Sequence, residues 1–188
     1  MTQRGPWKIV QSREVYADPW IRVQVDDVIR PDGNAGIHSI IQIKPGVCVV
    51  ALDADHQVQL AEEFHYAVGR VTLEGVSGGI EPGEAPLDTA RRELREELGI
   101  VAARWTGLGV VDPFTANVVS PTEIYLAEEL TFGEPAHEGT ERICRVTIPL
   151  GDAIRMISES KITHGPTCVA LLRTWIERQA SILGRGNA

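Results

Sequence analysis

A glycine-rich loop that runs into one amphipathic helix constrains the fold of this chain more than any other feature. Residues 75–84 read GVSGGIEPGE, and Pro86 follows at a position that suits the first turn of a helix. Four apolar residues then recur at spacings of three and four: Leu87, Ala90, Leu94 and Leu98. One stripe of the helix is therefore apolar, and Gly99 is placed to end it. We expect a loop–helix unit packed against a core on one side.

Strand-like segments lie on both sides of this unit. In the first forty residues apolar side chains alternate with polar ones, as in half-buried strands. Residues 31–36 (PDGNAG) predict a turn, and 53–56 predict a hairpin. Further strands are predicted for six segments: 37–43, 47–52, 57–64, 105–111, 123–130 and 142–148. Two helices, 151–159 and one that starts near Pro166, complete an α+β pattern.

Composition and charge exclude several classes of protein. The length of 188 residues suits one domain with a full core. The formal net charge of -8, without a basic patch, disfavours a nucleic-acid partner. The longest apolar run, 47–52, is too short to cross a bilayer, and no signal-peptide core is visible, so no membrane partner is expected. Three widely spaced cysteines argue against a disulfide framework and a zinc site, and they favour the cytoplasm.

Three glutamates crowd one flank of the predicted helix: Glu93, Glu96 and Glu97. The simplest interpretation is a solvated face with ion pairs such as Arg92 with Glu96, worth roughly a few tenths of a kcal/mol. However, the signs are separated, and Glu93 and Glu97 are like charges one turn apart. Charges ~6 Å apart repel by about 0.7 kcal/mol in water and by about 3 at an effective dielectric of 20. A bound cation would relieve this repulsion, and Mg²⁺ prefers hard oxygen ligands.

The loop ahead of the helix contributes mainly backbone. Gly78, Gly79 and Gly83 allow positive φ and close approach to a partner, although such strings also mark ordinary turns. Glu84 adds a carboxylate, which by itself would be a favourable charge near a helix start. The loop and the glutamate face together favour a metal site for a phosphorylated substrate.

Together these residues resemble the Nudix box. The signature reads Gly78, five residues, Glu84, seven residues, and then RELREELGI over 92–100. The resemblance implies a hydrolase that cleaves a nucleoside diphosphate linked to another moiety, with Mg²⁺ or Mn²⁺. It also implies an α/β fold, a Nudix-type α/β/α sandwich with mixed sheets and an N-terminal antiparallel strand segment, which sharpens the α+β pattern.

The resemblance assigns roles to individual residues. Three of them match the metal-binding glutamates of the box: Glu93, Glu96 and Glu97. Glu93 and Glu97 are also catalytic candidates. Glu84 matches the loop glutamate that helps organise the metals, and Arg92 matches an arginine that orients the glutamates. Ser77 stands where a small residue binds metal through its backbone carbonyl.

A longer stretch, 31–84, is similar to the ADP-ribose and nucleotide-sugar pyrophosphatase branch, which implies ADP-ribose or an ADP- or GDP-sugar as substrate. Leu73-Glu74 matches a Leu-Glu pair of that branch, and Glu74 is a candidate substrate contact. The chain departs from the branch at Gly75-Val76-Ser77, where Leu-Pro-Ala is usual, and in the only loosely similar loop 111–117. It also has His65 where an arginine is usual. His65 is expected either to contact a phosphate or the ribose, or to be structural.

The catalytic base of the branch is often a glutamate on a flexible loop beyond the box. Glu138 and Glu141 are the matching candidates, and the residues do not decide between them. Taken singly, a glutamate at such a position is more often a plain surface residue than a base.

The N-terminal strands of the branch often build a dimer and reach the active site of the partner. Residues 1–43 are therefore expected to form a dimerisation arm, and 44–188 the hydrolase domain. Trp20 and Arg22 are the candidates for the contact with substrate. The chain is expected to be a homodimer.

A function of another class remains open, a Nudix-fold module that senses a nucleotide without hydrolysing it. Such modules usually lose glutamates of the box. All are present in this chain, which favours the enzyme.

Overall fold

The computed structural model describes residues 2–137, 139 and 142–185, and its contacts divide the chain into two compact units. Unit 1 comprises Met1–Pro45 and Asp112–Pro121, and unit 2 comprises Gly46–Val111 and Thr122–Ala188. In the described part of the chain, no helix is long and apolar enough to span a membrane.

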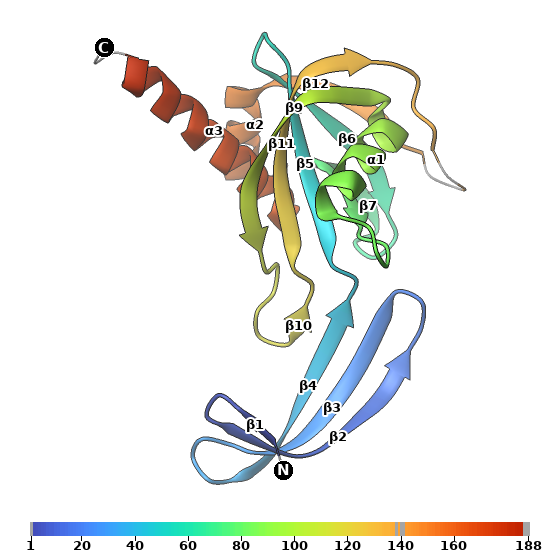
Figure 1. The fold of residues 1–188 in the computed structure, drawn as a ribbon, viewed down its shortest axis with the longest axis vertical. Coiled ribbons are helices and arrows are strands. Elements are labelled where there is room, and N and C mark those ends of the chain that lie inside the picture. Colours follow the sequence, from blue (N-terminus) through green and yellow to red (C-terminus); the bar gives the residue numbers. More distant parts are fainter. Residues whose placement is uncertain (1, 138, 140–141, 186–188) are drawn as a thin grey trace. The chain divides into compact units, whose positions relative to one another are not determined.

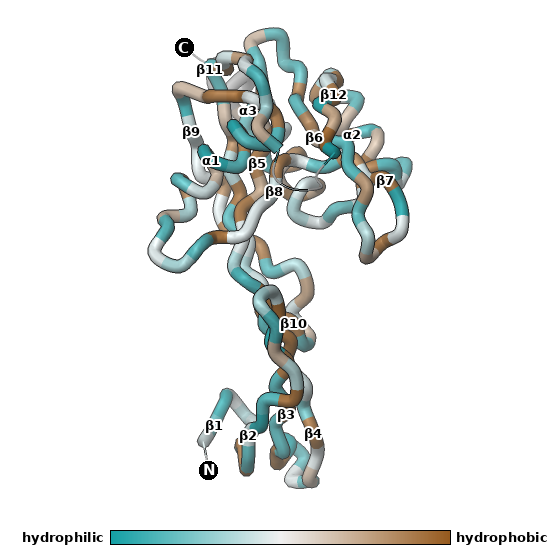
Figure 2. Tube along the Cα trace, turned by 90° about the vertical axis from the view of Figure 1, so that its right-hand side faces the viewer, coloured by the Kyte–Doolittle hydropathy of each residue, from teal (hydrophilic) through white to brown (hydrophobic). Residues whose placement is uncertain are grey.

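Unit 1 is a sheet with the strand order β1-β2-β3-β4-β10 (Figure 1). Its strands are β1 (Thr2–Arg4), β2 (Trp7–Ala17), β3 (Ile21–Ile29), β4 (Ala35–Ile43) and β10 (Val118–Val119). Neighbouring strands are antiparallel from β1 to β4, whereas β10 runs parallel to β4. Hydrophilic and hydrophobic residues alternate along these strands (Figure 2), which is the pattern of half-buried strands.

Unit 2 is built on a mixed sheet with the order β12-β6-β5-β11-β9, to which β7 and β8 add at β6 and β5. Its strands are β5 (Gly46–Leu52), β6 (Gln57–His65), β7 (Arg70–Glu74), β8 (Val76–Gly79), β9 (Ile100–Val111), β11 (Thr122–Phe132) and β12 (Cys144–Pro149). Its helices are α1 (Pro86–Leu98), α2 (Leu150–Ser158) and α3 (Gly165–Arg185). The β5–β11 pair is parallel, and the other pairs are antiparallel.

The core of unit 2 has one layer on each face of β5. Cys48, Val50 and Leu52 join a cluster that includes residues of α2 and α3. The alternate residues of β5 join a second cluster with the apolar stripe of α1: Val47, Val49 and Ala51. Helices thus cover both sides of the sheet (Figure 1), and the expected α/β/α sandwich with mixed sheets is observed.

Helix α1 follows its predicted bounds closely. Pro86 stands in the first turn, and Gly99 ends the helix with φ 65°, its N–H donating to the Arg95 carbonyl. Leu94 and Leu98 are buried, and burial of each such side chain is worth about 1.5–3 kcal/mol. Gly99 is required for a second reason, because a Cβ there would lie 2.4 Å from the Gly133 carbonyl oxygen.

One predicted strand begins earlier than expected. The sequence pattern placed it at 105–111, whereas β9 starts at Ile100, directly after the helix. Ile100 is fully buried beside α1 and pairs with Phe132 of β11. Tertiary pairing therefore extends the strand through Ala102 and Ala103, residues with little strand preference of their own.

Candidate active site

The glutamates of α1 face strand β8 at a point where a side chain is missing. A Cβ built on Gly78 would lie 2.0 Å from Oε1 of Glu93, so the glycine leaves the space that this carboxylate occupies. Glu97 lies one turn further along, and its carboxylate, like that of Glu74, raises the pKa of the buried Cys48 thiol, although burial itself is the larger cause. The glutamates thus lie on the side of α1 that meets β5 and β8.

Arg92 holds three carboxylates through one guanidinium group. Its Nε and Nη2 donate to the two oxygens of Glu84 at 3.0 and 3.1 Å, and its Nη1 donates to Glu93 at 2.9 Å and to Glu96 at 3.1 Å. The bidentate hydrogen bonds from Arg92 lower the pKa of Glu84 to about 2. Arg92 therefore fixes the orientation of carboxylates that would otherwise repel each other.

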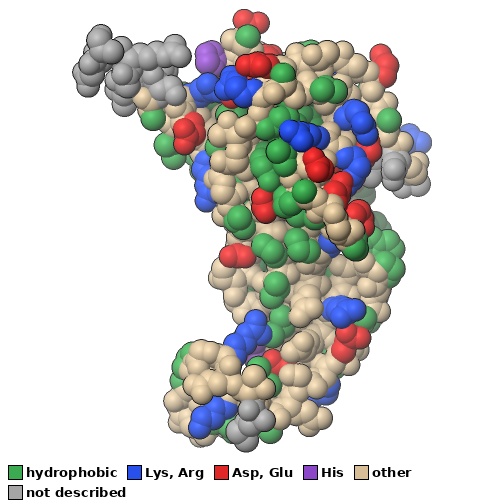
Figure 3. All heavy atoms as spheres, in the orientation of Figure 1, with side chains coloured by type: hydrophobic (Ala, Val, Ile, Leu, Met, Phe, Trp, Pro, Cys, Tyr) green, Lys and Arg blue, Asp and Glu red, His purple; other side chains and the backbone are tan. Residues whose placement is uncertain are grey.

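Negative charge still exceeds positive charge on this face. The carboxylates of Glu84, Glu93 and Glu96 share two guanidinium groups, those of Arg92 and of Arg95, and Arg95 reaches Glu96 at 3.7 Å. Figure 3 shows acidic and basic side chains interspersed over α1. An additional cation is the simplest way to balance such a face.

The donor set fits a hard divalent cation. In the described part of the chain, no three His, Cys, Asp or Glu side chains already surround a common metal position. The donors gathered here are nevertheless carboxylate oxygens next to the β8 backbone, and Mg²⁺ usually keeps several waters and substrate phosphates instead of entering a complete protein cage. The residues present therefore fit the metal that the family resemblance implies.

Ser77 lies in β8, opposite Cys48 of β5 and next to Gly78. Its hydroxyl donates to the Gly75 carbonyl at 3.0 Å, and the Gly75 N–H donates to Oγ1 of Thr167, a fully buried residue of α3, at 2.8 Å. A Cβ on Gly75 would lie 2.7 Å from the Val49 carbonyl oxygen, so this position accepts glycine alone. The Thr167 hydroxyl of α3 thus holds the backbone two residues before Ser77.

His65 and Glu74 lie together, and they are joined by a residue that the sequence analysis missed. Nε2 of His65 is 3.4 Å from Oε1 of Glu74, and Nδ1 of His164 is 3.0 Å from Oε2 of the same carboxylate. His164 precedes α3 by one residue. No local signal marked it, because a single histidine in front of a helix is common in surface segments.

The start of the distal loop is attached to the C-terminal end of α1. The Ala136 N–H donates to the Glu96 carbonyl at 2.8 Å, and Nε2 of His137 lies 2.8 Å from the Glu97 carbonyl oxygen. Both of the candidate bases, Glu138 and Glu141, lie outside the described residues. The described start of the loop therefore lies beside the C-terminal end of the helix that carries the candidate metal ligands.

Trp20 and Arg22 belong to unit 1 and line a hollow of about 300 Å³ there. Trp20 is 73% exposed and lies in the turn between β2 and β3, where Oδ1 of Asp18 accepts its backbone N–H at 2.8 Å. Arg22 lies 3.8 Å from Glu14, and both side chains are exposed. These two candidates therefore lie side by side on an open surface of unit 1.

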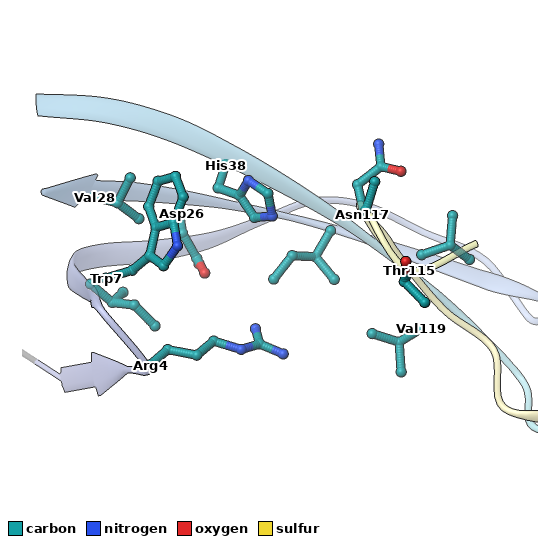
Figure 4. A pocket seen from close by; sticks show the side chains of 12 residues that line it. Arg4, Trp7, Asp26, Val28, His38, Thr115, Asn117 and Val119 are labelled. Atoms are coloured by element: carbon teal, nitrogen blue, oxygen red, sulfur yellow. The ribbon is translucent and has the colours of Figure 1, made fainter. Parts of the chain in front are cut away.

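A second hollow of unit 1, of about 400 Å³, combines aromatic, acidic and basic side chains (Figure 4). Trp7 and His38 have ring centroids 5.6 Å apart, and the nearly buried Asp26 accepts a hydrogen bond from Gln24. Arg4 lines the opposite side of the same hollow. The sequence analysis did not single out Asp26 or His38.

Two family models together cover most of the chain. Residues 7–41 match the nucleoside diphosphate sugar hydrolase N-terminal domain, and residues 42–161 match the NUDIX domain. The second match includes the glycine-rich loop, α1 and Glu84, Glu93, Glu96 and Glu97.

Curated relatives and a solved structure agree with these matches. The ADP-ribose pyrophosphatase of Bacillus subtilis (strain 168) is 27% identical over 172 residues, which cover 87% of this chain and 90% of that protein. The ADP-ribose pyrophosphatase of Mycobacterium tuberculosis (strain ATCC 25618 / H37Rv) is 25% identical, covering 88% and 82%. The crystal structure of an ADP compounds hydrolase superposes with a TM-score of 0.79 at 20% identity and covers 95% of this chain and 98% of that one. This last likeness confirms the fold.

Proposed function

Because this chain belongs to the Nudix family and is a Nudix hydrolase, we propose that it cleaves the pyrophosphate bond of a nucleoside diphosphate linked to a sugar. ADP-ribose is the first candidate substrate, and an ADP- or GDP-sugar is the second. The observation that carries the proposal is the group of carboxylates that Arg92 holds beside Gly78 of β8.

We assign the metal ligands to the α1 glutamates and the neighbouring backbone. Glu93, Glu96 and Glu97 would hold Mg²⁺ or Mn²⁺, with Glu84 and the Ser77 carbonyl beside them. Such an ion, when bound, offsets the charge of the pyrophosphate and lowers the pKa of a water molecule. Arg92 would keep the carboxylates in place and limit their mutual repulsion before substrate arrives.

We assign the base to the distal loop, with Glu138 ahead of Glu141. The base must come within hydrogen-bond reach of the attacking water and accept its proton. The attachment of Ala136 and His137 to the end of α1 supports this assignment, because it brings the start of the loop beside the helix of the metal ligands.

We further propose that the chain is a homodimer that pairs through unit 1. Apolar side chains are exposed on its strands and turns: Val10, Val15, Tyr16, Trp20, Ile37 and Ile43. Where such residues form a contiguous patch, the patch marks a protein contact site. Light scattering at micromolar concentration tests the proposal, and a mass near 20.6 kDa would contradict it.

One experiment tests the enzymatic proposal as a whole. The purified protein is incubated with Mg²⁺ and a panel of nucleoside diphosphate sugars, and the products are identified by mass. We expect a nucleoside monophosphate and a sugar phosphate from at least one member of the panel. Tight binding without products would instead indicate a nucleotide-sensing module.

A further inference from the structure

The strands of unit 2 part beside the candidate active site. β5 and β6 pair at Ala51↔Gln59 and Leu52↔Val58, but further along β5 pairs with β8 while β6 pairs with β7. His65 ends β6 and Glu74 ends β7, and the segment in front of α3 brings His164 to them. Three polar side chains from distant parts of the chain thus meet where the sheet opens.

The Glu74 carboxylate contacts one ring nitrogen of His65 and one of His164. Its Oε2 lies 3.0 Å from Nδ1 of His164, and its Oε1 lies 3.4 Å from Nε2 of His65 and also accepts the Thr72 hydroxyl at 2.6 Å. An ionised carboxylate only accepts, so these contacts favour the tautomer in which each of these ring nitrogens carries the hydrogen. The remaining nitrogens are Nε2 of His164 and Nδ1 of His65, for which the described residues offer no hydrogen bond.

Exposure increases from the carboxylate outwards. The side chains of Glu74, His164 and His65 are 15%, 28% and 40% exposed. Burial lowers the pKa of His164, and the nearby Glu74 carboxylate only partly opposes this. The neutral ring then presents a lone pair at Nε2, which accepts a hydrogen bond from a hydroxyl group.

The charges of the cluster do not favour an anion. The Glu63 carboxylate is 4.0 Å from Nε2 of His65, so two carboxylates face this ring. Arg70, opposite His65 in the sheet, donates to the Thr163 hydroxyl. Even with His65 protonated and Arg70 included, positive charge does no more than balance the two carboxylates, so a neutral polar group fits better than a phosphate.

The cluster is also joined to the backbone of the candidate metal site. Oγ1 of Thr167 lies 2.8 Å from Nδ1 of His164 and accepts the Gly75 N–H, two residues before Ser77. Glu74 and Glu97 both act on the same buried thiol of Cys48. The backbone segment that leads to Ser77 is thus hydrogen-bonded to the same Thr167 hydroxyl that contacts His164.

We propose that His65, Glu74 and His164 form the subsite that binds the hydroxyl groups of the sugar half of the substrate. The inference rests on the proposed function and deepens it. A sugar diol donates to the lone pair of an imidazole nitrogen and needs no compensating charge. The histidine at position 65 would thus select a sugar where an arginine would select a phosphate.

Two substitutions remove the outward nitrogens while keeping the contacts with Glu74. In His164→Asn the amide nitrogen replaces Nδ1 and Nε2 is lost, and in His65→Gln the amide nitrogen replaces Nε2 and Nδ1 is lost. His56→Asn is the matched control, since His56 lies in the β5–β6 turn with φ 58°, a conformation that asparagine tolerates. Circular dichroism confirms the folding of each variant.

Calorimetric titration of the full chain with ADP-ribose and with ADP is the deciding measurement. We expect each site variant to bind ADP-ribose about tenfold more weakly and ADP unchanged, with the control like wild type. Equal losses for both ligands, no loss in either, or a wild type that binds ADP-ribose no tighter than ADP would overturn the subsite. Hydrolysis by the wild type is measured in a separate experiment. A wild type that binds ADP-ribose without hydrolysing it would contradict the proposed function but not the sugar subsite.

Discussion

Two groups of carboxylates in unit 2 are arranged in opposite ways. Beside α1, the carboxylates of Glu84, Glu93 and Glu96 share two guanidinium groups, and Arg92 reaches all three. At the end of β7, the single carboxylate of Glu74 lies between two imidazoles and also accepts a hydroxyl. The first group carries excess charge and suits a cation, whereas the second is nearly balanced and suits a neutral polar ligand. The difference in charge balance therefore predicts different ligands, a cation beside α1 and a neutral polar group at the end of β7.

The largest expected effect comes from removing one charge from the α1 group. Glu97→Gln should lower kcat at least about a hundredfold at saturating Mg²⁺, because an anionic ligand of the metal is lost. The melting temperature should change little, since a like-charge contact is also relieved. Glu62→Gln, an exposed glutamate of β6, is the control. A Glu97→Gln variant with near-wild-type kcat would show that the metal assignment is wrong.

The base should behave differently from the metal ligands. We expect Glu138→Gln to lower kcat by about a hundredfold while the Mg²⁺ dependence of the rate stays unchanged. Glu141→Gln should then retain most of its activity. Rates measured from pH 6 to 9 over a range of Mg²⁺ concentrations distinguish the two variants. If both keep wild-type kcat, the base lies elsewhere, and Glu93 becomes the leading candidate.

A substitution on β8 should disturb the α1 group without removing any charge. In Gly78→Ala the new Cβ would lie 2.0–2.5 Å from Oε1, Cδ and Cγ of Glu93, so that side chain would have to move as a whole. We expect kcat to fall about tenfold, because a misplaced ligand weakens catalysis less than a lost one. Gly107→Ala is the control, as its nearest neighbour would be 4.0 Å away. An unchanged kcat would contradict the idea that catalysis depends on the position of the Glu93 carboxylate.

The two groups of carboxylates also differ in how far they could be predicted from the sequence. The loop–helix unit was predictable because its signals are local: Pro86 in the first turn, an apolar stripe and Gly99 at the end. The second group was only half predictable. His65 and Glu74 belong to neighbouring strands, whereas His164 lies far along the chain and Thr167 reaches Gly75 across 92 residues. Contacts of this kind arise from packing of α3 on the sheet, which no short pattern encodes.

The predicted division of the chain at residue 43 remains a prediction. The contacts assign a further segment, Asp112–Pro121, to the N-terminal unit, because β10 pairs with β4. Two valines in a loop of mixed composition gave no sign of this pairing. A parallel pair between distant segments is invisible to a local reading of the sequence.

The smallest expected effect is a difference in how the melting temperatures of two variants depend on pH, measured in metal-free buffer. Glu84 has its pKa lowered from 4.5 to about 2, mainly by the hydrogen bonds from Arg92. A lowered carboxylate pKa stabilises the fold above pH 4.5, and this contribution disappears as the pH falls towards 2. His164 has its pKa lowered from 6.5, mainly by burial, so the wild type should lose stability as the pH falls below 6.5. We expect the melting temperature of Glu84→Gln to lie about 1–3 °C below that of wild type at pH 6, and the gap to close as the pH falls towards 2. The difference between His164→Asn and wild type should instead change between pH 7 and 5. If both differences change over the same pH range, the two groups do not titrate independently.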